Sequence, residues 1–582
     1  MMRILGLSSL THDTAAALLV DGVFKAAIED DKLLRTRSRN RPEAAIRACF
    51  ESAGAAWEDI GCVAIAQRPL HGWLRKAYLR AKFSAVAPVA SAYYGANEAG
   101  ALAKDLNHFR VLRHYATGSE HRVLEFDHHL CHAASAFFLS PFERSLIVTM
   151  DEEGDGVSAL LAVGEGNRIR VRQTIPFPHS LAWVYSQVTN LAGFRPHVEE
   201  HKTQWLSLEG EPLFKDVFLK MFSRGGRTLH LDYSFFTRGL AGKRCFSDKF
   251  YRATGLPKHG RLEEEQSKAL ASSIQAACTE LITRLVEDFR RQEGIEQVCF
   301  SGGLFQNVLL VASLEKNLGM DNVFVPPAPG NAGTSLGAAC LVWHHSLDKP
   351  RTAPMDNVYL GPRFGSQAVK DVLDNTKSRY VLPNTEDRKL DATVNLLQAG
   401  KIVGWVQGAA EFGPRALGNR SVLASPWAPY VKENLNDFIK HREWFRPFAI
   451  SISEEDCPKY FEASRQCRFM NSVATVREGS QCLPESFLLP KGQVRLHVVQ
   501  RSANPIYWAL LKRFGEQAPA PMLLNTSFNL FGEPLVITPR DAMRSYFGSG
   551  LDALVIERFV LAKNSVQTAA ISVAATRVAQ GA

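Results

Sequence analysis

The feature that most constrains the fold of this 582-residue chain is a repeated plan of three short apolar runs. In the first copy the expected strands are residues 3–8, 15–20 and 23–28. In the second copy they are residues 145–150, 157–163 and 169–175. Each copy has a polar loop after its first strand and a tight turn after its second, as in a hairpin. Such a repeat predicts two lobes whose polar loops face a shared cleft.

Composition excludes several classes of protein. A formal charge of +9 spread over this length does not predict binding to nucleic acid, and small anionic substrates explain it equally well. The ten cysteines form no Cys-x-x-Cys pair, which favours reduced thiols in a cytoplasmic protein. We find no signal-peptide pattern and no apolar run of membrane-spanning length, so neither secretion nor membrane insertion is expected.

Two histidines and a carboxylate predict a metal site. His128 and His132 are four residues apart in an Ala-rich stretch, so a helix there places both imidazoles on one face. Asp151 follows the apolar run 145–150, at the end of an expected buried strand. Two imidazoles and one carboxylate suit a divalent transition metal, although a histidine pair alone is more often structural. A zinc-protease site is excluded because position 129 is His where that chemistry needs Glu.

Two glycine turns predict contact with a nucleotide. Residues 298–301 read as a strand that leads into Gly302, Gly303 and the helix start at Asn307. A second turn of this kind spans residues 330–337. Glycines at a strand-to-helix turn let backbone N–H groups approach phosphate or ribose, aided by the helix N-terminus. The alternative is that these glycines only make tight turns.

The second half of the chain carries a set of cations among Gly, Pro and aromatic residues. A polar, proline-containing stretch near residues 346–357 marks the boundary before it. The cations are Arg415, Arg420, Lys440, Arg442 and Arg446. Cations in such surroundings are expected to be partly buried and therefore to need anionic partners, with phosphates the natural choice. Internal salt bridges are the alternative. The apolar run 522–524 then leads into Asn525 and Ser527, whose side chains can hydrogen-bond a phosphate group.

These motifs together resemble the NodU/CmcH-type O-carbamoyltransferases, which include antibiotic carbamoyltransferases. The resemblance rests on the loop 11–16, the stretch 127–136, the loop 151–156, the Gly302-Gly303 turn and the cation runs, and it covers residues 3–563. It implies an α/β fold class: an N-terminal duplicated actin-like ATPase (ASKHA) domain, residues 1–350, and a C-terminal YrdC-like domain, residues 366–565. Residues 351–365 are the expected linker and residues 566–582 a tail.

By this resemblance the first domain performs carbamoyl transfer. His12 carries over as general base toward an acceptor hydroxyl, in keeping with a loop histidine that titrates near neutrality. His128, His132 and Asp151 carry over as metal ligands, with Fe(II) expected. Gly302, Gly303, Asn307 and Lys202 are expected to bind an adenylate. The fourth family ligand is an Asp where this chain has Asn331, an uncharged and weaker ligand.

Two further departures accompany Asn331. Glu152 stands where the family usually has Gly, which leads to the hypothesis that it replaces the lost ligand charge. Trp205 stands where the family has Gly, so it either reshapes the acceptor pocket or belongs to the core.

By the same resemblance the second domain makes carbamoyl-adenylate from carbamoyl phosphate and ATP, used with Mg²⁺. Lys440, Arg446, Arg495 and Ser527 are expected to bind carbamoyl phosphate and the nucleotide phosphates, with Lys440 catalytic. Arg415, Arg420, Arg442 and Asn525 are expected to support them. The family's Arg-x-Gln appears here as Arg495-Leu496-His497.

The expected function is thus ATP-dependent O-carbamoylation of a small-molecule natural product, such as an antibiotic in secondary metabolism. Carbamoylation of a macromolecule or a nitrogen, and a non-catalytic nucleotide- or metal-binding protein of the same fold, are the alternatives. The expected partners are ATP, carbamoyl phosphate and the hydroxyl acceptor, with neither nucleic acid nor membrane. A homodimer is left open, and the sequence does not name the acceptor.

Overall fold

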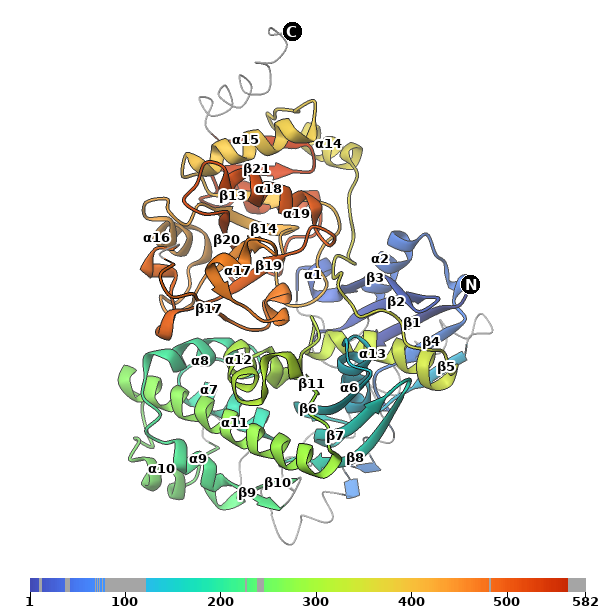
Figure 1. Ribbon diagram of the computed structural model, residues 1–582, viewed down its shortest axis with the longest axis vertical. Coiled ribbons are helices and arrows are strands. Elements are labelled where there is room, and N and C mark those ends of the chain that lie inside the picture. Colours follow the sequence, from blue (N-terminus) through green and yellow to red (C-terminus); the bar gives the residue numbers. More distant parts are fainter. Residues whose placement is uncertain are drawn as a thin grey trace. The chain divides into compact units, whose positions relative to one another are not determined.

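The protein, seen here as a computed structural model, forms two compact units (Figure 1). The structure describes residues 1–9, 13–36, 42–68, 70, 72, 74–75, 77–78, 122–225, 228–237, 245–480 and 483–563. The first unit comprises Met1–Lys25, Ser38–Ile46 and Ala53–Met355. The second comprises Ala26–Arg37, Arg47–Ser52 and Asp356–Ala582.

The first sheet contains the first copy of the repeat. Its strands lie in the order β3-β2-β1-β4-β5, with β1 antiparallel to β2 and parallel to β4. Their bounds are β1 (Arg3–Ser8), β2 (Ala15–Val20), β3 (Val23–Glu29), β4 (Cys62–Ile65) and β5 (Arg122–Glu125). The central strand β1 is buried from Ile4 onward, as its unbroken apolar run predicts.

The second sheet repeats this plan. Its order is β12-β11-β6-β7-β8, and β6 is antiparallel to β7 and parallel to β11. The bounds are β6 (Arg144–Gly154), β7 (Val157–Glu165), β8 (Arg168–Pro176), β11 (Val298–Ser301) and β12 (Val323–Phe324). In both sheets a three-stranded antiparallel meander continues into two parallel strands. The repeat inferred from the sequence is therefore confirmed.

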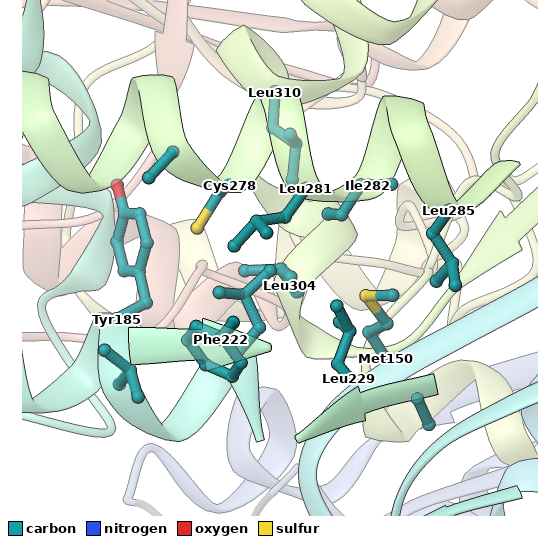
Figure 2. Packing of buried hydrophobic residues seen from close by; sticks show 14 of the residues in the cluster. Met150, Tyr185, Phe222, Leu229, Cys278, Leu281, Ile282, Leu285, Leu304 and Leu310 are labelled. Carbon is teal, nitrogen blue, oxygen red and sulfur yellow. The ribbon is translucent and has the colours of Figure 1, made fainter. Parts of the chain in front are cut away.

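Helices and a hairpin complete the first unit. The described helices that lie wholly in this unit are α6 (His128–Phe138), α7 (Leu181–Leu191), α8 (Glu200–Leu206), α9 (Lys215–Met221), α10 (Asp248–Thr254), α11 (Glu264–Glu293), α12 (Val308–Leu318) and α13 (Thr334–Leu341). Helix α2 (Glu43–Ala53) is divided, because its residues 47–52 group with the second unit. The hairpin is β9 (Phe222–Gly225) and β10 (Thr228–Leu231). Figure 2 shows core side chains of α11, among them Ile282 and Leu285, on the side of the cluster where Met150 of β6 lies. This apolar cluster supports β6 from one side, and β6 carries a candidate metal ligand.

Helix α13 packs unusually close to α6 and β1. A Cβ on Gly337 would lie 1.9 Å from the carbonyl oxygen of Cys131 in α6. A Cβ on Gly6 would lie 2.0 Å from the carbonyl oxygen of Ser335. Glycine at both positions lets the three backbones approach, which fixes α6 against the first sheet.

The second unit is built on a seven-stranded mixed sheet in the order β19-β15-β20-β14-β13-β21-β22. The bounds are β13 (Val403–Val406), β14 (Arg420–Ala424), β15 (Ala449–Ser453), β19 (Leu496–Val499), β20 (Met522–Ser527), β21 (Ala553–Ile556) and β22 (Phe559–Ala562). A small sheet holds β16 (Phe461–Glu462), β17 (Ala474–Val476) and β18 (Gln493–Val494). The helices are α1 (Asp30–Leu34), α14 (Ser366–Asn375), α15 (Glu386–Gln398), α16 (Val431–Leu435), α17 (Cys457–Tyr460), α18 (Pro505–Gly515) and α19 (Pro539–Phe547).

The predicted α/β fold class is confirmed: the first unit contains two sheets of the same plan, and the second is built on one mixed seven-stranded sheet with helices. Residues 347–365 contain no helix or strand. The units do not follow a single boundary, because residues 26–37 and 47–52 group with the second unit. The functional domain limits at residues 350 and 366 stay a prediction. No helix within the described ranges is long and apolar enough to span a membrane.

Candidate functional site

The imidazoles of His128 and His132 converge with the carboxylate of Asp151. Both histidines lie on α6, four residues apart, and Asp151 lies on β6. The Nε2 atoms of the two histidines are 3.1 Å apart. The Oδ2 atom of Asp151 is 3.2 Å from Nε2 of His132 and 3.7 Å from Nε2 of His128. All three side chains are buried.

These distances fit a shared metal ion. Two ligand atoms that each lie about 2.1 Å from one ion, at angles of about 90–110°, are about 3.0–3.4 Å apart. Two imidazole nitrogens that face each other, with a carboxylate oxygen beside them, present lone pairs toward one point. Within the described residues this is the group of His, Cys, Asp or Glu side chains placed to hold a metal. The donor set of two nitrogens and one oxygen suits a divalent transition metal.

The surroundings fix the tautomer of His132. The hydroxyl of Ser301, on β11, donates its proton to the carbonyl of Pro329, and its oxygen lies 3.1 Å from Nδ1 of His132. Nδ1 of His132 therefore carries the proton and donates it to Ser301, which leaves Nε2 with a free lone pair toward Asp151. The side chain of Asn331 lies near enough to His132 to raise its pKa, so the residue expected as fourth ligand lies beside the cluster.

The three ligands polarise one another. Burial would raise the pKa of Asp151, but the imidazoles of His128 and His132 outweigh burial and hold that pKa well below its usual range. Burial would lower the pKa of His128, yet the hydrogen bond and charge of Asp151 raise it. For His132 burial prevails, and its pKa is lowered. Asp151 is thus held as a carboxylate, the form that binds metal.

The strand β6 is longer than predicted and includes Glu152. The sequence predicted a loop from residue 151, whereas β6 continues to Gly154 with an irregular register after Met150. The carboxylate of Glu152 lies 2.6 Å from Nδ1 of His197 and is not part of the metal-ligand group. The hypothesis that Glu152 replaces the missing ligand charge is not supported by this geometry and stays a prediction.

Gly154 makes room for His128, which gives a test of how tightly the site is packed. A Cβ on Gly154 would lie 2.1 Å from Cδ2 of the His128 ring. We expect Gly154→Ala to push that imidazole out of place, to lower bound metal and to destabilise the protein by about 1–3 kcal/mol. Metal analysis and thermal unfolding measure both effects. Gly365→Ala is the control, since a Cβ there meets nothing within 4 Å. Equal behaviour of the two variants would contradict this packing.

The residues expected to bind an adenylate in the first unit are only partly free to contact a ligand. Gly302 adopts φ +105°, and a Cβ there would lie 2.1 Å from the Met150 carbonyl, so this turn requires glycine. Gly303 lies next to Asp151, and a Cβ on it would be 3.0 Å from Oδ1. The Asn307 side chain caps α12 through Leu310 and hydrogen-bonds Gln275. Asn307 thus orients α12 rather than presenting its amide outward.

Lys202 and Trp205 lie on α8. The Nζ atom of Lys202 is 3.0 Å from Glu199 and 5.5 Å from the centroid of the Phe194 ring. Trp205 is 4% exposed, which favours its role in the core. His12, the expected general base, lies outside the described residues.

In the second unit a set of cations converges, defined here as the cation cluster: Arg415, Lys440, Arg442, Arg446 and Arg495. Burial lowers the pKa of Arg442 to about 9, and the charge of Arg446 adds to this effect. Burial and Arg446 lower the pKa of Arg415 to about 10. The pKa of Arg495 falls well below its usual range through burial and through three arginines of the cluster. Lys440 is buried and the four arginines are half-buried. Mutual repulsion among cations in such a place is relieved by an anion.

Lys440 is held by the end of β20. Its ammonium donates to the backbone carbonyl of Ser527 and, at 2.8 Å, to the side-chain oxygen of Asn529. Burial, followed by the charges of Arg442 and Arg446, lowers its pKa well below the usual value. The carboxylate of Glu443 lies 3.5 Å from Arg446.

Arg420 does not join this cluster. Its guanidinium donates to four backbone carbonyls, those of Gln407, Gly408, Asn419 and Pro362. The charges that act on its pKa after burial are those of Glu411 and Glu557. A guanidinium whose N–H groups already donate to carbonyls has few donors left for phosphate. Arg420 therefore has the surroundings of a structural residue, and its expected phosphate contact is not supported by this geometry.

Asn525 and two residues without a predicted role complete the site. The amide of Asn525 donates to the Ala416 carbonyl at 3.3 Å and to the Ser451 hydroxyl at 3.1 Å. Asn529 and Ser301 were present in the motifs but received no role. Their signal was weak, because a hydroxyl or amide at a strand end is common and only its neighbours in space give it meaning.

The comparisons with known proteins agree with these two centres. A family model described as carbamoyltransferase N-terminus matches residues 3–340, and one described as carbamoyltransferase C-terminus matches residues 394–563. The chain is 33% identical over 604 residues to an uncharacterized protein of Synechocystis, covering 97% of each chain. It is 32% identical over 569 residues to nodulation protein NolNO of Sinorhizobium fredii, covering 96% of this chain and 80% of that one.

A third relative is nodulation protein NolO of Bradyrhizobium diazoefficiens, 34% identical over 447 residues, with coverage of 75% of this chain and 79% of that one. Among solved structures, full-length HypF in its phosphate- and nucleotide-bound form is 15% identical, with a TM-score of 0.30 over 59% of this chain and 46% of that one, too distant a likeness to bear on function. The two family models together cover most of the chain. The chain therefore belongs to the carbamoyltransferase family and is a transferase.

Proposed function

We propose that the protein is an ATP-dependent O-carbamoyltransferase. In this proposal it makes carbamoyl-adenylate from carbamoyl phosphate and ATP, and then transfers the carbamoyl group to a hydroxyl of a small-molecule natural product. The observation that carries the proposal is the cation cluster, whose half-buried arginines lie near enough to lower one another's pKa values around the buried Lys440. A triphosphate and an acyl phosphate are the anions that suit such a cluster.

The proposed first step takes place in the second unit. Hydrolysis of carbamoyl phosphate gives carbamate and inorganic phosphate. A carbamate oxygen then attacks the α-phosphate of ATP, the bond to the β-phosphate breaks, and pyrophosphate leaves. Lys440 and the arginines neutralise charge on the phosphates, and Ser527 and Asn525 orient the small substrate. Positioning and electrostatic stabilisation supply most of the rate in phosphoryl transfer.

The proposed second step takes place in the first unit. His12 accepts the proton of the acceptor hydroxyl, whose oxygen attacks the carbamoyl carbon, and AMP leaves. His128, His132, Asp151 and Asn331 would hold a divalent metal, for which we propose Fe(II), and a bound cation there would supply positive charge to the adenylate phosphate. Lys202 and the backbone at Gly302 and Gly303 are proposed to bind the adenylate. Because carbamoyl-adenylate hydrolyses readily, both steps in one chain limit its loss to water.

The proposal is tested by separating the two steps. With Mg²⁺, ATP and carbamoyl phosphate, we expect release of pyrophosphate, and of AMP as the adenylate hydrolyses. His12→Ala should keep pyrophosphate release within about twofold, yet lower carbamoylation of an acceptor by about 10²–10⁴-fold, the usual contribution of a general base. Coupled phosphate assays and mass spectrometry of candidate acceptors, screened for one added carbamoyl group, measure the two steps. Absence of pyrophosphate release with any divalent metal would reject the adenylate route.

A further inference from the structure

A short segment from the N-terminal part of the chain belongs to the second unit. This segment, called here the α1 segment, spans residues 26–36 and includes the end of β3 and helix α1. The backbone N–H of Ala27 donates to the carbonyl of Leu360 at 2.9 Å. Three charged side chains of the segment reach residues near the cation cluster. They are Glu29, Lys32 and Arg35.

Lys32 and Glu29 hold the loop that carries Arg415. The ammonium of Lys32 donates to the backbone carbonyls of Glu411 at 2.8 Å and Gly413 at 2.7 Å. The carboxylate of Glu29 accepts the N–H of Gly413 at 2.8 Å and pairs with Lys32 at 2.9 Å. Both side chains are at least nine-tenths buried. Gly413 is thus bound on both of its peptide groups, two residues before Arg415.

The backbone conformation of Gly413 explains why its contacts with Lys32 and Glu29 affect the position of Arg415. Gly413 has φ +104°, a value that side-chain-bearing residues rarely adopt. The following residue is Pro414, whose ring fixes its own φ. Arg415 therefore follows a turn whose backbone has little conformational freedom once Gly413 is fixed. The charge of its guanidinium is coupled to those of Arg446 and Arg495.

Arg35 contacts residues 533–535, which follow Asn529 in the chain. Its guanidinium donates to the carbonyls of Pro534 and Leu535 at 2.9 and 3.0 Å and pairs with the Glu533 carboxylate. The carbonyl of Glu533 accepts from the amide of Asn529, the residue whose side-chain oxygen accepts from Lys440. Two residues, Glu533 and Asn529, thus link Arg35 to Lys440, Glu533 through its side chain on one side and its backbone carbonyl on the other.

We propose that Glu29, Lys32 and Arg35 are positioning residues of the phosphate-binding site, which set Arg415 and Lys440 in place for the activation of the carbamoyl group. They act through backbone carbonyls and through Asn529, and they do not touch the substrate. A buried ion pair contributes little net stability compared with apolar side chains of similar size, so the precise placement of a loop is the better reason for Glu29 and Lys32. The inference rests on the proposed function.

A double-mutant cycle tests this proposal in the full-length protein. Lys32→Met removes both carbonyl contacts and keeps the length of the side chain. We expect the KM for carbamoyl phosphate in pyrophosphate release to rise about tenfold, because Arg415 loses its fixed position. In an Arg415→Gln background the same change should raise KM by less than about twofold, since coupled residues are not additive. The double change Glu29→Gln with Lys32→Met should keep the raised KM, although it leaves no unpaired buried charge.

Lys389→Met is the matched control. Lys389 is a lysine of the second unit that is 2% exposed and is bound to Glu386 and Gln407, and it has no part in the cation cluster. Its loss should lower thermal stability but leave KM within about twofold. Arg35→Lys should raise KM less than Arg35→Gln, since a lysine still donates to the carbonyls.

The outcomes separate the two proposals. If the unmutated protein releases no pyrophosphate, the proposed function fails and this inference fails with it. If the unmutated protein is active and Lys32→Met changes only thermal stability, as Lys389→Met does, the segment is merely structural and the inference alone is overturned. An equal rise of KM with and without Arg415 would also overturn it, because Lys32 would not act through that residue.

Discussion

Replacing Lys440 by Ala should abolish carbamoyl-adenylate formation while the protein stays folded. We expect kcat/KM for pyrophosphate release to fall by about 10³-fold or more, in line with the loss of one buried charged contact to the reacting group. Lys440 donates to Ser527 and Asn529 and is surrounded by arginines, so its charge is placed where phosphate charge would lie. Stopped-flow or steady-state assays of pyrophosphate release with ATP and carbamoyl phosphate measure the effect.

The control for Lys440→Ala is again Lys389→Met, which removes another buried lysine of the same unit. Both variants lose a desolvated ammonium, so both are expected to be less stable. Only Lys440→Ala should lose pyrophosphate release at a temperature where both remain folded. Carbamoyl transfer from preformed carbamoyl-adenylate should persist in Lys440→Ala. A loss of both steps in this variant would mean that the two sites are not separate.

The local and periodic parts of the structure could be predicted from the sequence. The repeat could be recognised because strands alternate with turns at short range. The turns contain residues typical of hairpins, as at Asp21-Gly22. The helical spacing of His128 and His132 was enough to predict that their imidazoles converge. The apolar run before Asp151 predicted that its carboxylate lies at the end of a buried strand.

The parts that depend on distant residues could not be predicted. Lys32 contacts the carbonyl of Glu411, 379 residues away, and no periodicity in the sequence encodes such a contact. Arg420 lies only five residues after Arg415, yet its guanidinium donates to backbone carbonyls that only the folded loop brings together. Glu152 follows Asp151 directly, but its carboxylate pairs with His197 and takes no part in the metal-ligand group. In each case the partner, rather than the residue, decides the role.

Replacing His132 by Ala should remove the metal without affecting the first step. His132 contributes one of three converging ligand atoms, and its Nδ1 is oriented by Ser301. We expect bound metal to fall from about one per chain to less than about a tenth, because loss of one ligand from a site with an uncharged fourth residue leaves too few donors. Elemental analysis after anaerobic purification gives the metal content and its identity. Pyrophosphate release should stay within about twofold, since the cation cluster lies in the other unit.

His129 offers a matched control for this prediction, because it is a buried histidine on the same helix turn. Its Nδ1 lies 2.7 Å from the Thr149 hydroxyl, and its Nε2 donates to the carbonyl of Val157 at 3.0 Å. Burial lowers its pKa well below the usual value, so it is a neutral core residue. His129→Gln should therefore keep its metal even if it is less stable. If His129→Gln and His132→Ala lost metal equally, the loss would reflect general loosening of α6. A His132→Ala protein that kept its metal would show that these imidazoles are not ligands, and the role of the first unit in transfer would need another source of positive charge.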